Sequence, residues 1–282
     1  MKSLITGSNG SCAYYLNRAL GGSHGLTRWD NVIERVDTVR PDVIFHLAAD
    51  ADVRGSFDHP ASTFLNNTGI TVNIFEACRK VGIKPVIVIC STSEVYGNPS
   101  SWPITEDFPT DRQTNPYAVS KMAQELIGNY YEKCYGFPVS RTRAFGYVNP
   151  RRQNLSLSSF ARQVVEIEEG RRADLHHGDL RSIRTFCDVR DIAKAYIKAA
   201  EHPGQAYNIG SENPISIKAC LEILCSYAQA EVITTQDEAL MRPLDVTNIV
   251  PDCSKFRKAT GWEPTITLKE SLRWLLESCR SI

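Results

Sequence analysis

Five consecutive apolar residues, 86–90, restrict the possible folds of this chain more than any other feature. A strand with one exposed face carries polar residues at alternate positions, so an unbroken apolar run indicates a strand buried on both faces. Further strands are expected at 1–6, 43–47 and 138–144, with helical segments between them. This alternation predicts an α/β fold of the Rossmann-like, doubly wound type, whose parallel sheet is covered by helices on both faces.

The helical segments can be placed from their apolar periodicity and their end signals. Asn115 and Pro116 fit the N-cap and the first position of a helix that continues to Tyr135. After about residue 150 the strand–helix rhythm loosens, and proline-rich loops separate the helices. The expected helices are at 14–20, 29–40, 60–81, 116–135, 157–169, 189–201, 216–229 and 267–279.

A glycine-containing turn, Gly7-x-x-Gly10-x-x-Ala13, lies between the first strand and the first helix. In that position, backbone N–H groups and the helix N-terminus can hold a dinucleotide pyrophosphate. Two glycines after a strand can also form a simple tight turn, so the pattern alone is weak. Together with the motifs below, it predicts an NAD(P)-binding Rossmann-like domain at 1–150. Residues 151–282 would form a smaller α/β substrate-binding lobe, some of whose strands and helices return to the first domain.

Two short segments supply groups suited to hydride and proton transfer. Tyr117 and Lys121 are four residues apart on an expected helix, which places them on one face, a turn apart. A phenol has an ordinary pKa of about 10, and a neighbouring ammonium favours its phenolate form. Thr92, at a strand end, can hold a substrate oxygen while the phenolate removes its proton. Glu94 adds a second base, which indicates chemistry on a sugar rather than simple alcohol oxidation.

Composition and charge exclude several classes of partner. Lysine plus arginine equals aspartate plus glutamate, at 32 each, so the overall charge gives no reason to expect nucleic acid or an anionic membrane. No apolar run approaches the roughly 18 residues that span a bilayer, and a strand that begins near Lys2 leaves no room for a signal peptide. We therefore expect a cytoplasmic protein whose nine cysteines, which include no C-x-x-C pair, stay reduced. His176 and His177 have no convergent ligand pattern, so no metal is expected.

The ordered set of motifs resembles the extended short-chain dehydrogenases/reductases that act on nucleotide sugars. Within them it is most similar to the branch of GDP-mannose 4,6-dehydratase and GDP-4-keto-6-deoxymannose reductase. The resemblance covers nearly the whole chain, and the set is far more specific than any one motif. The matching segments are LITGSNG at 4–10, PDVIFHLAA at 41–49, STSEVYG at 91–97, NPYAVSK at 115–121, NPRRQ at 149–153, FARQVVEIEEG at 160–170, RTFCDVRDIAKAY at 184–196, MRPLDV at 241–246 and SKFRKATGWEP at 254–264.

This resemblance implies a role for each matching residue. Thr92, Tyr117 and Lys121 would form the hydride-transfer triad. Glu94 would remove the C5 proton of the sugar, and Ser93 stands where some dehydratases carry an acidic residue. The implied cofactor-binding residues are Gly7, Ser8, Asn9, Gly10, Leu47, Ala48, Ala49 and Asn67, together with Tyr117 and Lys121. The implied substrate-binding residues are Arg184 and Arg242, which would clamp the diphosphate, and Asp245, which would orient one of them.

Each of these residues also has a structural explanation of its own. Tyr117 could be a half-buried helix aromatic, and Glu94 could cap the turn after its strand. The arginines could form surface ion pairs with nearby aspartates, with little effect on stability. These explanations account for each residue singly but not for the joint order of the motifs, so the functional interpretation is favoured.

Two features depart from the family pattern. No second strand with a ribose-reading residue at its end is recognisable. About one strand–helix unit is therefore expected to be missing on the adenosine side of the sheet, where Arg28 is a candidate contact. Gly146 stands where related enzymes usually carry an asparagine, which removes a side-chain amide expected near the substrate.

The sequence therefore predicts a nucleotide-sugar 4,6-dehydratase of GDP-mannose type, in which Tyr117 starts hydride transfer and Glu94 assists elimination. The alternatives left open are a GDP-4-keto-6-deoxyhexose reductase, a nucleotide-sugar 4-epimerase, or a non-catalytic protein that binds nucleotide sugars or dinucleotides. The resemblance implies NADP or NAD as cofactor, with NADP favoured, and a GDP-hexose as substrate. It also implies a homodimer or homotetramer, built by the helices at 60–80 and 116–135.

Overall fold

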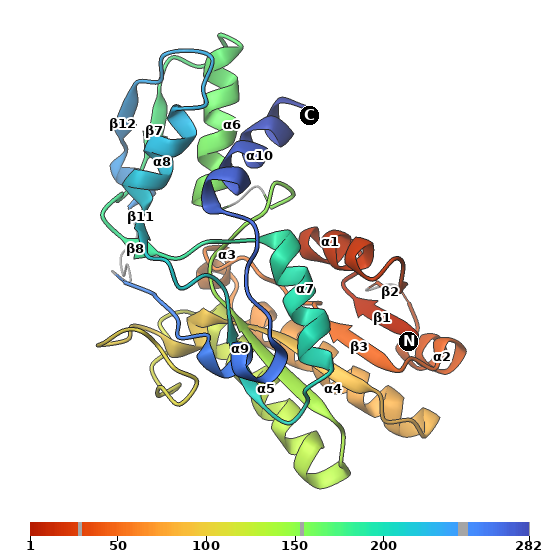
Figure 1. Ribbon diagram of the computed structural model, residues 1–282. Coiled ribbons are helices and arrows are strands. Elements are labelled where there is room, and N and C mark those ends of the chain that lie inside the picture. Colours follow the sequence, from red (N-terminus) through yellow and green to blue (C-terminus); the bar gives the residue numbers. More distant parts are fainter. Residues whose placement is uncertain (28–29, 153–154, 242–247, 282) are drawn as a thin grey trace.

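The computed structural model describes residues 1–27, 30–152, 155–241 and 248–281. Its centre is a sheet of six parallel strands in the spatial order β10-β5-β4-β3-β1-β2 (Figure 1). The predicted Rossmann-like, doubly wound fold is confirmed. The strand bounds are Ser3–Thr6 (β1), His24–Leu26 (β2), Val43–His46 (β3), Val86–Thr92 (β4), Val139–Ala144 (β5) and Ala206–Ile209 (β10).

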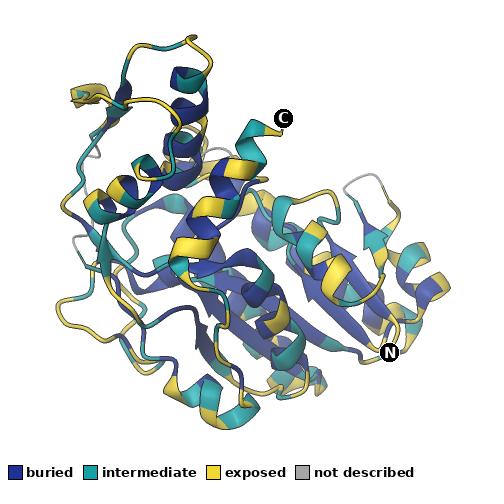
Figure 2. Cartoon of the chain, turned by 45° about the horizontal axis from the view of Figure 1, so that its top comes forward, coloured by how far each residue is buried: buried dark blue, intermediate teal, exposed yellow. Residues whose placement is uncertain are grey.

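Helices cover both faces of this sheet. Successive strand residues point to opposite faces. Phe45 and Val88 therefore pack beneath one set of helices, whereas Ile44 and Ile87 pack beneath the other. Apart from β2, the strands are buried on both sides, in agreement with their apolar runs (Figure 2). The first set is α1 (Ser11–Ala19) and α7 (Val189–Ala200), and the second is α2 (Val32–Val39), α4 (Pro60–Val81) and α5 (Pro116–Tyr135).

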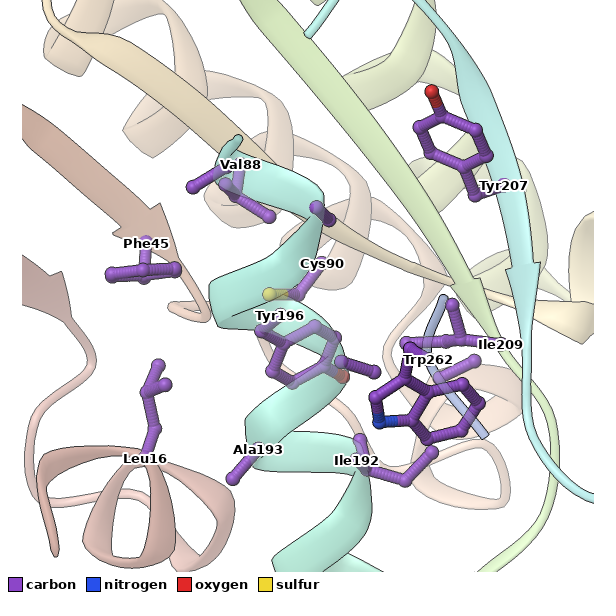
Figure 3. Packing of buried hydrophobic residues seen from close by; sticks show 14 of the residues in the cluster. Leu16, Phe45, Val88, Cys90, Ile192, Ala193, Tyr196, Tyr207, Ile209 and Trp262 are labelled. Atoms are coloured by element: carbon purple, nitrogen blue, oxygen red, sulfur yellow. The ribbon is translucent and has the colours of Figure 1, made fainter. Parts of the chain in front are cut away.

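The core beneath α7 joins segments that are far apart in the sequence. Tyr196 of α7 lies close to Cys90 of β4 (Figure 3). Trp262, which follows α9 (Ser254–Thr260), packs in the same cluster as Ile209 of β10. The last third of the chain therefore returns to the sheet and completes its core.

Local signals set the ends of the two longest helices. Pro60 and Pro116 begin α4 and α5, at a position where a backbone N–H is not needed for the helix. The side chain of Asn115 accepts a backbone N–H of the first turn of α5. Gly82 and Gly136 follow the helices with φ of 73° and 67°, in the left-handed region that glycine adopts without a steric penalty. The predicted bounds of both helices are confirmed.

A second group of elements lies above the sheet in Figure 1 and has its own core. Phe160, Leu221 and Leu275 belong to this core, which joins three helices. Two short parallel strands flank them. These elements are α6 (Ser156–Glu168), α8 (Ile217–Cys225), α10 (Leu268–Arg280), β7 (Leu175–His177) and β12 (Thr234–Gln236).

β2 corrects one expectation from the sequence. A second strand is present, because His24–Leu26 pairs in parallel with β1 and places Gly25 opposite Ile5. The strand has only three residues and begins at an exposed histidine, so no apolar run marks it. Within the described residues, no strand lies beyond β2. The sheet is therefore short on this side because it lacks the unit that would follow β2, and not because it lacks β2 itself.

Three smaller differences concern boundaries. The helix expected from residue 29 begins at Val32 after the N-cap Asn31, and Arg28 and Trp29 lie outside the described residues. β4 continues past Cys90 to Thr92, and α8 ends earlier than predicted, at Cys225.

None of the described helices combines the length and the apolar composition that a membrane span requires.

Candidate active site

The predicted site residues come from separate segments that meet at one edge of the sheet. Because the strands are parallel, their carboxyl ends lie along the same edge. Gly7 follows β1, Leu47 follows β3, and the 3₁₀ helix η1 (Ser93–Tyr96) follows β4. Tyr117, in the first turn of α5, hydrogen bonds to Thr92 at the end of β4. The sheet topology thus assembles the glycine turn and the Thr–Tyr pair.

The Tyr117 side chain is almost fully enclosed, with 7% of its surface exposed. Burial raises the pKa of its phenol to about 12, which keeps the group protonated near neutral pH. Two neighbours oppose this effect: the positive charge of Arg152 and the hydrogen bond with Thr92 both lower the pKa. A base formed from Tyr117 therefore needs a nearby cation to stabilise the phenolate.

Lys121 lies one helical turn after Tyr117 and is also buried. Its Nζ donates a hydrogen bond to the backbone carbonyl of Cys90, with 2.8 Å between the two atoms. Burial lowers the pKa of this ammonium to about 8. Lys121 is therefore not a solvated surface lysine, since its ammonium is anchored to the strand that carries Thr92.

Glu94 lies in η1, two residues after Thr92, and is half-buried. The Thr92 hydroxyl accepts the backbone N–H of Glu94 at 3.2 Å. The Glu94 carboxylate accepts a hydrogen bond from the amide of Asn115 at 2.9 Å. Asn115 also caps α5, so one side chain ties the carboxylate to the helix that carries Tyr117. Ser93 is buried beside it.

The glycine turn packs closely against the segment that follows the third strand. Gly7 has φ of 66°, and a Cβ placed on it would lie 2.9 Å from the Cα of Ala48. The backbone N–H of Gly10 donates to the carbonyl of Gly7 at 2.8 Å, which closes the turn. α1 begins with neither a side-chain cap nor an acidic residue in its first turn. These features fit a dinucleotide pyrophosphate, which backbone N–H groups at a helix N-terminus bind. Ser8 and Asn9 complete the turn.

The side chain of Asn67 hydrogen bonds to the loop that follows β3. Its side chain is fully buried, accepts the backbone N–H of Asp50 at 2.7 Å and donates to the Asp50 carbonyl at 3.0 Å. It also donates to the hydroxyl of Ser120, on α5, at 2.9 Å. Asn67 therefore fixes the loop that contains Ala48 and Ala49 against the catalytic helix.

Arg152 is a residue of this site that the sequence reasoning did not assign. Its Nη2 donates to the carbonyl of Ala51 at 2.7 Å, and its guanidinium also hydrogen bonds to Tyr147. It is the residue with the largest lowering effect on the pKa of Tyr117. The segment NPRRQ contained the signal, but nothing in the sequence distinguished this arginine from Arg151.

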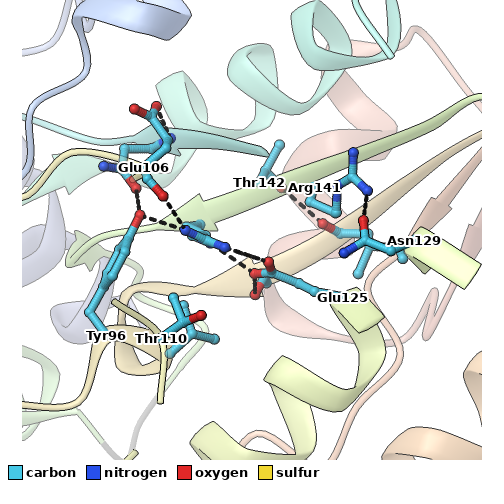
Figure 4. A network of polar contacts seen from close by, with 12 residues as sticks. Tyr96, Glu106, Thr110, Glu125, Asn129, Arg141 and Thr142 are labelled. Atoms are coloured by element: carbon cyan, nitrogen blue, oxygen red, sulfur yellow. Dashed lines mark hydrogen bonds and ion pairs between the residues drawn. The ribbon is translucent and has the colours of Figure 1, made fainter. Parts of the chain in front are cut away.

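A buried ion pair supports the strand end behind the site, and it too was missed (Figure 4). Glu125 accepts hydrogen bonds from Arg143, with 2.8 Å between Nη2 and Oε2, and from the hydroxyl of Ser91 at 2.5 Å. Arg143 also donates to the Tyr96 hydroxyl at 3.0 Å and to the carbonyl of Glu106 at 3.1 Å. Glu125 follows Lys121 by one turn of α5, but this spacing does not indicate a pairing with Arg143, which lies on β5.

The predicted substrate-binding residues are only partly described. Arg184 is half-buried in β8 (Ile183–Arg184), and its Nη1 donates to the carbonyl of Ile183. Arg242 and Asp245 lie outside the described residues. The aspartates that could have paired with Arg184 have other partners: Asp188 bonds to Arg190, and Asp191 to Lys194.

Neither metal ligation nor disulfide formation marks the described part of the chain. It contains no group of three or more histidine, cysteine or acidic side chains arranged to hold a metal ion. All nine cysteines are free thiols.

Comparison with known proteins identifies the family. The sequence profile described as GDP-mannose 4,6 dehydratase matches residues 23–275. The chain belongs to this family. Its members are NAD(P)-dependent enzymes of the extended short-chain dehydrogenase/reductase type, so the expectation of an enzyme is confirmed.

Individual relatives carry different activities. The chain is 31% identical to a GDP-6-deoxy-D-mannose reductase of Pseudomonas aeruginosa, over 98% of this chain and 96% of that protein. It is also 31% identical to a UDP-glucuronate 4-epimerase of Thermodesulfobacterium geofontis, over 84% of this chain and 72% of the epimerase. The family is therefore shared by reductases and epimerases of nucleotide sugars.

Solved structures agree with this family assignment. RMD from P. aeruginosa complexed with NADPH superimposes with a TM-score of 0.91 at 29% identity, covering 100% of this chain and 99% of the other. The UDP-glucose 4-epimerase of Thermus thermophilus complexed with NAD gives a TM-score of 0.87 at 25% identity, covering 99% of each chain. The fold of this family is thus one that binds NAD(P).

Proposed function

We propose that this member of the family is a nucleotide-sugar 4,6-dehydratase acting on a GDP-hexose of the GDP-mannose type. The observation that carries the proposal is the position of Glu94. Its carboxylate is bonded to Asn115, the N-cap of the helix that bears Tyr117, and its negative charge raises the pKa of that phenol. Plain reduction needs a single proton-transfer group, whereas elimination also needs a base for C5, and in this proposal Glu94 is that base.

The proposed sequence begins at C4 of the sugar. Tyr117 removes the proton of the C4 hydroxyl while the Thr92 hydroxyl holds that oxygen. The glycine turn of Gly7 and Gly10 would hold NADP, or less favourably NAD, which would supply the hydride exchange between C4 and C6. The C4 ketone acidifies C5, and Glu94 removes the C5 proton. The C6 hydroxide leaves with that proton as water, and C5 takes up a proton from solvent when the hydride reaches C6. Because Ser93 is not acidic, Glu94 would itself pass the proton to the leaving oxygen.

In this proposal, the second half of the chain binds the substrate. Residues 1–150 would hold the dinucleotide and residues 151–282 the nucleotide sugar. Arg184 and Arg242 would clamp the diphosphate with paired guanidinium donors, and Asp245 would orient one of them. Homodimers or homotetramers would form through α4 and α5, where Leu65 and Leu126 are 68% and 56% exposed.

Product analysis tests the dehydratase proposal directly. Purified protein would be incubated with GDP-mannose and a trace of NADP, and the sugar nucleotide examined by mass spectrometry. A 4-keto-6-deoxy product, lighter by one water, is expected without net formation of NADPH. Recovery of unchanged GDP-mannose from a preparation that binds NADP would overturn the proposal.

A second candidate is a GDP-4-keto-6-deoxyhexose reductase. It is favoured by the full-length match to the P. aeruginosa reductase, and it requires only Thr92, Tyr117 and Lys121. A reductase would consume one NADPH for each 4-keto sugar reduced, whereas the dehydratase would leave the total of NADPH unchanged. A 4-epimerase would instead return an isomer of unaltered mass.

A further inference from the structure

Two cavities flank the start of α1 and meet at one arginine. The larger, of about 870 Å³, extends from the glycine turn toward α7 and α10. The smaller, of about 490 Å³, extends from the same turn toward β2. Asn9, Tyr14 and Arg151 line both cavities, and among the described residues neither wall contains an aspartate or glutamate. Arg151 thus stands over the glycine turn in surroundings suited to an anion.

The structure holds Arg151 in this position from two sides. Its backbone N–H donates to the side chain of Asn149 at 3.0 Å, and Asn149, which is fully buried, donates to the hydroxyl of Ser11 at 3.3 Å. Its guanidinium carbon lies 4.3 Å from the ring centre of Tyr14, in the first turn of α1. Both its backbone and its side chain are therefore fixed to the segment that begins α1.

Its charge is not neutralised by the protein. Within the described residues, Arg151 forms no ion pair, whereas Arg190 and Lys194, which line the same cavity, do. Arg190 bonds to Asp188 at 2.8 Å, and Lys194 bonds to Asp191 at 3.0 Å. Arg151 therefore retains its donors and its full charge for a ligand at the glycine turn.

We propose that Arg151 binds a phosphate group of the dinucleotide held at the N-terminus of α1. A guanidinium offers paired donors that match phosphate oxygens, and its stacking on Tyr14 orients them in advance. The neighbouring Arg152 contacts Ala51 and acts on Tyr117, so two successive arginines would serve the phosphate end and the catalytic end of one site. The inference rests on the proposed function only in requiring NAD(P) as the ligand.

Binding measured without any sugar tests this role independently of the dehydratase reaction. The dissociation constants of NADP and NAD would be determined by titration calorimetry for wild type, Arg151→Gln and Arg151→Lys. Loss of hydrogen bonds to a charged group predicts roughly tenfold to hundredfold weaker binding in Arg151→Gln, with partial recovery in Arg151→Lys. The affinity of the Gln variant should also fall less steeply with salt.

Arg18 provides a matched control. Its guanidinium lies over the same Tyr14 ring, at 5.7 Å, but one helical turn farther from the glycine turn. Arg18→Gln should leave both dissociation constants unchanged. Weaker binding of both dinucleotides by Arg151→Gln assigns the contact to the pyrophosphate, and weaker binding of NADP alone assigns it to the 2′-phosphate. Unchanged affinity for both, in a variant with a wild-type melting temperature, would overturn the proposal. So would an equal loss in Arg18→Gln.

Discussion

The Nζ atom of Lys121 lies 2.8 Å from the carbonyl oxygen of Cys90 and donates a hydrogen bond to it. Cys90 precedes Thr92 by two residues on the same strand, and Lys121 follows Tyr117 by one turn of the same helix. This single bond therefore joins the two elements that carry the proposed catalytic groups. The ammonium is buried, which lowers its pKa to about 8. The charge that the chemistry needs is consequently sensitive to mildly alkaline pH.

Activity should decline as the pH rises above about 8. The ordinary pKa of Lys121 is 10.5, and burial shifts it downward, so its proton is lost earlier than from an exposed lysine. Loss of that positive charge removes support for the Tyr117 phenolate. We expect kcat/KM to fall by up to tenfold per pH unit beyond the transition, measured between pH 6 and 10. Lys121→Arg, slower overall, should lack this decline. A flat wild-type profile to pH 10 would contradict the prediction.

Glu94→Gln should separate elimination from hydride transfer. The substitution keeps an oxygen that can accept the Asn115 amide but removes the base, so the site should keep its shape. The dehydration rate is expected to fall by about 10²- to 10⁴-fold, the usual contribution of a positioned general base. Oxidation at C4 should persist. It can be monitored by the absorbance of reduced nicotinamide during incubation with GDP-mannose. Tyr117→Phe should lose both steps, and full dehydration by Glu94→Gln would exclude the proposed base.

Removing only one partner of the buried Arg143–Glu125 pair should destabilise the protein. Both side chains are nearly inaccessible, at 7% and 1% exposure. Arg143→Met would leave the Glu125 carboxylate without its charged partner, and a loss of about 3–5 kcal/mol in the free energy of unfolding is expected. The double variant Arg143→Met/Glu125→Leu should recover much of that loss. Urea unfolding of the wild type, the single variants Arg143→Met and Glu125→Leu, and the double variant measures the coupling, and additive effects would contradict it.

The regular elements could be predicted because their signals are local. α4 and α5 each begin at a proline and end before a glycine, and both sets of bounds agree with the structure. β2 could not be predicted in the same way. It has three residues, one of them an exposed histidine, and it exists because its backbone pairs with β1. Its formation depends on the assembled sheet and not on its own pattern.

The same distinction applies to the candidate site. Thr92, Glu94, Tyr117 and Lys121 stand in two short segments whose spacing is recognisable in the sequence. The pairing of Arg143 with Glu125 joins different elements, and its specificity arises from burial that only the fold creates. Arg152 shows the same limit, since its effect on the Tyr117 phenol depends on a proximity that only the folded chain creates.

Gly146 gives the last prediction, because the structure explains the absence of the expected asparagine. A Cβ at this position would lie 2.5 Å from the carbonyl oxygen of Thr185 and 3.2 Å from the ring of Phe186. The backbone of 185–187 occupies the space of a side chain, and Gly146 accepts the N–H of Cys187 at 2.9 Å. Gly146→Asn should therefore not restore an amide to the site. It should lower the free energy of unfolding by about 1–3 kcal/mol or more, and Gly146→Ala should do nearly the same.

Gly69→Ala is the matched control for this change, because a Cβ at that helical position meets nothing within 4 Å. Replacing a helical glycine by alanine there should stabilise the protein by about 0.5–1 kcal/mol. Urea unfolding of the three variants would measure these differences, with KM for the sugar nucleotide measured in parallel. Wild-type stability in Gly146→Asn together with a lower KM would show that the 185–187 segment can withdraw. In that case the missing amide, rather than the close backbone contact, would be what distinguishes this site from its relatives.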